Sequence, residues 1–138
     1  MRSALRALAP AARKTLFREI VRDLAARNRK RMSAQAGPEG DPWEKRKPNR
    51  NGRVRSYAKM MTGLRAARRL RATSAADGAE LGWTGRNARI ASVHQLGAAD
   101  LVEPGGPAVK YPTRELIGFA AEDIARIRDR MLAHLSGA

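Results

Sequence analysis

An amphipathic helix is predicted near each end of the chain, and neither helix can bury its apolar stripe alone. In the first helix, which should run from Pro10 to about Gln35, apolar residues recur at steps of one and three between Leu16 and Leu24. Proline is favoured at a first helical position, where its missing N–H has no partner to lose. The second helix, residues 121–135, begins with acidic residues and continues with arginines, which suits the helix dipole. A third element must therefore pack against both.

Between the helices, turn residues divide the chain into short elements. Asp77-Gly78 is a strong hairpin turn pair, so residues 68–75 and 79–84 are predicted to form a β-hairpin. A short helix is expected over residues 86–96 and a returning strand over 108–116. The predicted fold class is α+β: a long N-terminal helix, a small antiparallel β-sheet with a hairpin, a short helix, and a C-terminal helix packed on the sheet.

The core is expected to join the two helix stripes to one face of this sheet. Ile20 and Leu24 of the first helix, and Ile124 and Met131 of the second, should then be mostly buried. A chain of 138 residues is long enough to bury such a core. Residues 1–138 are therefore expected to form a single domain.

The charge of the chain is distributed unevenly. Residues 1–71 hold 21 Lys and Arg against 5 Asp and Glu, whereas residues 72–138 hold 7 against 8. Such asymmetry indicates a surface that meets a polyanion or an acidic partner, although a solvated, arginine-rich surface would have the same composition. Residues 37–58, rich in Gly, Pro and Asn, are predicted to form a long basic loop. Its candidate partner-contact residues are Arg46, Lys47, Arg50, Arg53 and Arg55.

Trp43 precedes the basic run of this loop. Its indole could stack on a nucleic-acid base, but the favoured interpretation is that it fixes the loop to the body of the protein. The remainder of the loop offers little apolar surface. Residues 38–59 are therefore expected to be mobile in the isolated protein and to become ordered on assembly, facing a protein partner more than DNA.

No catalytic, cofactor-binding or metal-binding motif is recognisable in the sequence. There is no Cys, which excludes disulfides and thiolate metal sites. His94 could act as a base or a ligand, but no carboxylate pair or second His accompanies it, so a structural role is expected. No run of about 18 apolar residues could span a membrane. The protein is therefore expected to be neither an enzyme nor a membrane protein, and to need no cofactor.

Three short patterns follow one another along the chain. The first is Pro-Glu-Gly-x-x-Trp at residues 38–43, and the second is KMMTGLR at residues 59–65, before the predicted sheet. The third begins with His-Gln-x-Gly at residues 94–97 and resumes, after a loop, with Pro-x-Arg-x-Leu-Ile-Gly at residues 112–118. In this order and spacing they resemble the phage virion morphogenesis family of contractile-tailed and Mu-like phages. Thr113, where Ala is commoner, and the long preceding loop depart from the family pattern.

This resemblance implies a structural virion protein that completes the head-proximal end of a phage tail and takes part in head–tail joining. The implied location is the virion tail or neck, after assembly in the bacterial host cytoplasm. The implied partners are other copies in a hexameric ring, tail tube or sheath terminator proteins, and head–tail connector proteins, with DNA passing through the lumen. Gly97 and Gly118 stand where elements end and positive φ is often needed. The motif residues to which the resemblance assigns a structural role are Trp43, His94, Gly97, Pro112, Arg114 and Gly118.

A second class of function stays open, namely a basic nucleic-acid-binding protein held by phosphate contacts. Against it, an aromatic content of 4% is low for a protein that stacks on bases. The salt dependence of DNA binding separates the two classes, because phosphate contacts give a steep slope.

Overall fold

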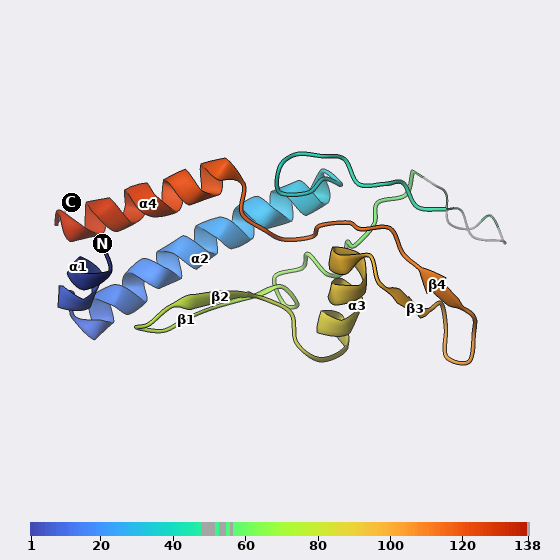
Figure 1. Cartoon of the computed structure of the whole chain (residues 1–138), viewed down its shortest axis with the longest axis horizontal. Helices are drawn as coiled ribbons and strands as arrows, with labels where there is room; N and C mark the ends of the chain where they lie inside the picture. Colours follow the sequence, from blue (N-terminus) through green and yellow to red (C-terminus); the bar gives the residue numbers. More distant parts are fainter. Residues whose placement is uncertain (48–51, 53–54, 56, 138) are drawn as a thin grey trace.

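The long helix α2 (Pro10–Ser33) is the element around which the others are arranged (Figure 1). The computed structural model describes residues 1–47, 52, 55 and 57–137. Helix α4 lies alongside α2, the first hairpin lies on another side of it, and α3 and the second hairpin lie beyond its C-terminal half. The other elements are α1 (Arg2–Ala7), β1 (Arg71–Ser74), β2 (Ala79–Gly82), α3 (Gly85–Leu96), β3 (Ala99–Leu101), β4 (Ala108–Lys110) and α4 (Ala121–Leu135).

The predicted first helix is confirmed, with Pro10 in its first turn. Ile20 and Leu24 are buried as expected, each 8% exposed. The helix ends at Ser33, just before the predicted position, and Gln35 then adopts a positive φ of 59°. That left-handed residue turns the chain away from the helix axis.

Helix α4 spans the predicted residues, and it packs against α2. The first hairpin also packs against α2. The C-terminal helix was predicted to pack on the sheet, but it packs on α2. The prediction that Ile124 is buried is wrong, because its side chain is 57% exposed, and Met131 is half-buried. The reason lies in Asp123, which is 2% exposed and faces arginines of α2. Consecutive helical residues point about 100° apart, so turning Asp123 inward turns Ile124 outward.

The predicted hairpin is confirmed with shorter strands, in the register Arg71↔Gly82 to Ser74↔Ala79. A second antiparallel hairpin, β3–β4, pairs Ala99 with Lys110. Its first strand was not predicted, and β4 covers only the beginning of the strand expected over residues 108–116. In the described part of the chain the strands thus form two separate two-stranded sheets.

Side-chain amides replace a strand partner for the segment that follows β4. Gln95 Oε1 accepts hydrogen bonds from the N–H groups of Leu116 and Ile117, and its Nε2 donates to the Ile117 carbonyl. The buried Asn28 accepts from the Gly118 N–H and donates to the Gly118 carbonyl. Buried main-chain groups need such partners, so these amides explain why an irregular segment can cross the protein here.

The main hydrophobic cluster lies where α2, the loop after it, α3 and this segment meet. Leu70 and Met32 are fully buried in it, and Ile90 and Trp83 pack against it. Its buried members are Met32, Trp43, Leu64, Leu70, Ala91 and Leu116. Among the residues described, no helix is both long enough and apolar enough to cross a bilayer.

Candidate partner-binding cleft

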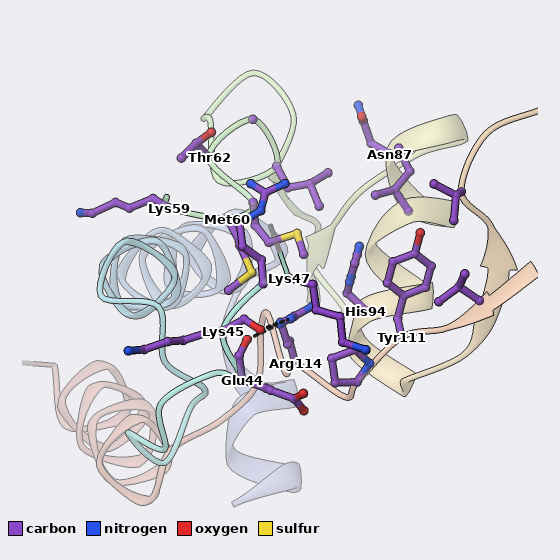
Figure 2. Close-up of a pocket in the computed structure, with 18 of the residues that line it drawn as sticks. Glu44, Lys45, Lys47, Lys59, Met60, Thr62, Asn87, His94, Tyr111 and Arg114 are labelled. Atoms are coloured by element: carbon purple, nitrogen blue, oxygen red, sulfur yellow. Dashed lines mark hydrogen bonds between the residues drawn. The ribbon is translucent and has the colours of Figure 1, made fainter. Parts of the chain in front are cut away.

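A cleft of about 940 Å³ opens between the start of the basic loop, α3 and the β3–β4 hairpin (Figure 2). Residues 44–47 and 59–64 line it from one side, and residues 109–112 and 114 line it from another. The side chains of α3 that reach it include Ile90 and His94. The cleft therefore gathers segments that are distant in the sequence.

The floor of the cleft is apolar, and a glutamine sets its position. Met60, Met61 and Tyr111 contribute to the floor. Gln35 donates from Nε2 to the Met60 carbonyl over 3.0 Å and accepts from the Met60 N–H over 2.6 Å. Met61 has a positive φ of 62°, an uncommon conformation for a residue with a side chain. Gln35, just after the end of α2, thus fixes the position of Met60 and of the adjacent Met61.

The cleft is strongly basic. Of the described residues that line it, seven are Lys or Arg and one, Glu44, is acidic. Figure 2 shows Lys45 and Lys59 extending outward, while Lys47 extends toward His94 and Tyr111. The basic lining residues are Lys45, Arg46, Lys47, Lys59, Arg69, Lys110 and Arg114.

Arg114 ties the basic loop to the rest of the protein. It is 6% exposed, and its Nε donates to the Glu44 carbonyl over 2.8 Å, with a longer bond from a terminal nitrogen to the Lys45 carbonyl. Its own N–H donates to the His94 carbonyl. Burial, reinforced by the charge of Arg46, lowers the pKa of Arg114, but a guanidinium remains protonated at neutral pH. The side chain therefore contributes a fixed positive charge beneath the loop.

His94 lies in the wall of the cleft, with its ring edge-to-face against Tyr111 at 5.0 Å between centroids. Burial and the nearby charge of Arg114 lower the pKa of His94 from 6.5, so the imidazole is neutral at pH 7. Its Nδ1 is buried without a hydrogen-bond partner in the part of the chain that the structure describes. The bond to the neighbouring segment comes from its backbone carbonyl. Across the described residues, no group of His, Asp and Glu is arranged to hold a metal ion.

The two motif glycines have different reasons to be glycine. Gly97 ends α3 with a φ of 63°, in the left-handed region as expected. Gly118 is not in that region, so the expectation of a positive φ there is wrong. A Cβ on Gly118 would instead lie 2.6 Å from Cγ of Pro38. Gly118 therefore permits close packing against the loop.

Trp43 is 7% exposed and donates from Nε1 to the Glu115 carbonyl over 3.0 Å. Its indole is thus packed in the core and is not presented for stacking on a base. Arg46 and Lys47 reach the cleft, together with Pro112. Arg55 is exposed, with its guanidinium 6.0 Å from the Tyr57 ring. The predicted contact residues Arg50 and Arg53 lie outside the described residues.

Sequence reasoning missed most of the apolar floor. Met60 and Met61 occur in the second motif but gave no periodic signal. Val102 and Val109 belong to the hairpin whose first strand was not predicted. The one available signal was the presence of apolar residues on either side of the Pro-Gly-Gly-Pro turn at residues 104–107.

The chain is similar to known phage proteins along almost its whole length. The sequence pattern of the phage virion morphogenesis family matches residues 1–136. The chain belongs to this family. Tail completion protein S of Escherichia phage P2 is 32% identical over 136 residues, which cover 95% of this chain and 89% of that protein. No solved structure matches the chain.

Family membership confirms the resemblance drawn from the three motifs, and it assigns the chain a role in phage virion morphogenesis. Family membership also implies a location in the virion tail. In the structure, three residues of the third motif, His94, Pro112 and Arg114, line the cleft. The cleft is therefore lined partly by residues of the motifs that resemble the family.

Replacing His94 by Gln should leave assembly of infectious particles at the wild-type level, because the imidazole packs against Tyr111 and has no hydrogen-bonded partner among the described residues. The pH dependence of the free energy of unfolding should also change. The folded-state pKa lies below 6.5, so the unfolded chain binds more protons and wild-type stability falls as pH drops below about 6.5. Chemical denaturation between pH 5 and pH 8 should show a weaker decline in the variant.

His134→Gln on α4 is the matched control for this substitution, because the His134 side chain makes no hydrogen bond or ion pair within the described residues. A His94→Gln protein that folds and enters particles but leaves them non-infectious would contradict the structural assignment and give the imidazole a direct role.

Proposed function

We propose that this protein completes the head-proximal end of a phage tail and takes part in joining the head to the tail. The observation that carries the proposal is the family match over residues 1–136, supported by a relative named tail completion protein S. Such a role requires binding surfaces and no chemistry. The described residues offer a basic, apolar-floored cleft and no cluster of His, Asp and Glu side chains that could hold a metal ion.

The protein acts in this proposal as a closed hexameric ring that matches the symmetry of the tail tube. A ring needs a heterologous interface, in which two different surfaces of each subunit meet. The uneven charge supports this, because residues 1–71 are strongly basic and residues 72–138 are close to neutral, so that each subunit offers two unlike surfaces.

The deciding experiment is negative-stain imaging of particles produced in cells that lack this protein. Heads separated from otherwise complete tails are expected. Intact, head-bearing particles, or tails that never form, would contradict the proposal. The nucleic-acid alternative is tested with the purified protein: tight binding to duplex DNA with a steep salt dependence would favour it.

A further inference from the structure

We propose that the cleft binds an acidic segment of another virion protein, which inserts apolar side chains against the methionine floor. This inference rests on the proposed function and adds to it the place and the chemistry of one partner contact. The binding mode is that of a short segment held by apolar anchors in a groove with a charged rim.

Charge is the first argument. The rim lysines Lys47, Lys59 and Lys110 form no salt bridge within the described residues. Several carboxylates that could have neutralised them are already paired with arginines elsewhere, as Asp23 is with Arg126. Like charges gathered around a concave surface raise the local potential and attract a ligand of opposite charge. An acidic occupant is the complement.

Exposed apolar surface is the second argument. On the β3–β4 hairpin, Val102 is 58% exposed and Val109 is 41% exposed, and both line the cleft. A two-stranded hairpin is marginally stable in water unless something packs on it. Its valines line the same cleft as Met60 and Tyr111. A contiguous apolar surface with a polar rim is typical of a protein–protein contact.

The same observations disfavour other occupants. A second copy of this chain carries a formal net charge of +15, and even its less basic part, residues 72–138, is only close to neutral, so it has little negative charge to offer a positive rim. Duplex DNA would neutralise the lysines but leave the apolar floor uncovered. Of the two aromatic residues in the basic loop, Trp43 is buried and cannot serve as a stacking platform. Tyr57 is exposed but does not line the cleft.

Photo-crosslinking in assembled particles tests the occupant directly. Benzoylphenylalanine replaces Val109 at the edge of the cleft and, as a control, Arg18 on the exposed face of α2. The Val109 site should crosslink to an acidic segment of a different virion protein, identified by mass spectrometry, and the Arg18 site should not. Crosslinks from Val109 to a second copy, or to residues 48–56 of the same chain, would overturn the proposal. So would the absence of any crosslink from Val109 in particles that contain the protein.

Charge reversal tests the electrostatic half of the argument. Lys47→Glu combined with Lys110→Glu should lower the yield of infectious particles about a hundredfold. The control, Lys14→Glu with Arg18→Glu, changes the same net charge at exposed positions of α2 and should have a far smaller effect. Second-site suppressors of the rim variant should introduce Lys or Arg into the crosslinked segment. Equal losses from both pairs, or no loss from the rim pair, would overturn the proposal.

The two proposals fail in different ways. If particles made without the protein show separated heads and tails, but Val109 crosslinks to a second copy, the tail-completion role stands and the cleft assignment falls. If those particles are intact, the tail-completion role falls, whatever the crosslinks show.

Discussion

Replacing Asp123 by Ala should lower the free energy of unfolding by about 3 kcal/mol, because it removes the buried partner of two arginines. Asp123 is 2% exposed, it pairs with Arg27 and Arg31, and it accepts the Ala120 N–H at the start of α4. The substitution would leave both guanidiniums short of a partner and one helix-terminal N–H unsatisfied. Denaturant titration of the purified monomer gives the measurement.

The pH dependence gives an independent check on Asp123. Burial alone would raise its pKa, but hydrogen bonds from Arg31, Arg27 and the Ala120 N–H outweigh that effect, and the pKa is lowered from 3.8. Stability from this group is therefore present above about pH 4 and is lost as pH falls through the lowered pKa. The Asp123→Ala variant should lose less stability in that acid range than the wild type. Asp129→Ala, at an exposed pair with Arg128, is the control and should be close to neutral.

Ile20→Asp should destabilise the protein by roughly 4 kcal/mol, because it places a carboxylate where the side chain is 8% exposed. The same substitution at Ile124, which is 57% exposed, should cost about 1 kcal/mol or less. The same substitution thus compares a buried position on α2 with an exposed position on α4. Thermal unfolding of both variants, at a concentration where the protein is monomeric, measures the difference.

Equal losses in the two isoleucine variants would mean that α4 presents a different face to α2 than the structure shows. No loss at Ile20 would reject the burial of this face of α2.

Local signals in the sequence predicted the elements well, since helix limits and hairpin turns depend on neighbours in the chain. Pro10 lies in the first turn of α2 as expected. The predicted β1–β2 hairpin forms, but Ala75 pairs with Gly78, so that Ala76 and Asp77 occupy the turn in place of Asp77-Gly78. The failures depend on distant contacts. The orientation of α4 is set by arginines of α2 that lie about a hundred residues away, as the Arg27–Asp123 bond shows. A hydrophobic pattern alone placed Ile124 inside, because it could not include a buried ion pair.

The candidate site was predictable only in its charge. The basic run predicted a partner-contact surface and included Arg46 and Lys47, which do line the cleft. The floor could not be predicted, because it depends on Gln35 holding Met60 across 25 residues and on a hairpin whose first strand is three residues long. Such short pairings give no periodicity to detect.

The side-chain amides of Asn28 and Gln95 form hydrogen bonds with main-chain atoms of the segment after β4. These bonds therefore do not depend on which side chains that segment carries. Thr113 and Glu115, both exposed, can therefore change without altering the path of the chain. Substitutions that adapt the surface to a new neighbouring protein then fall at different positions from substitutions that unfold the protein. The outward positions of this segment can thus diversify while the two amides keep its course constant.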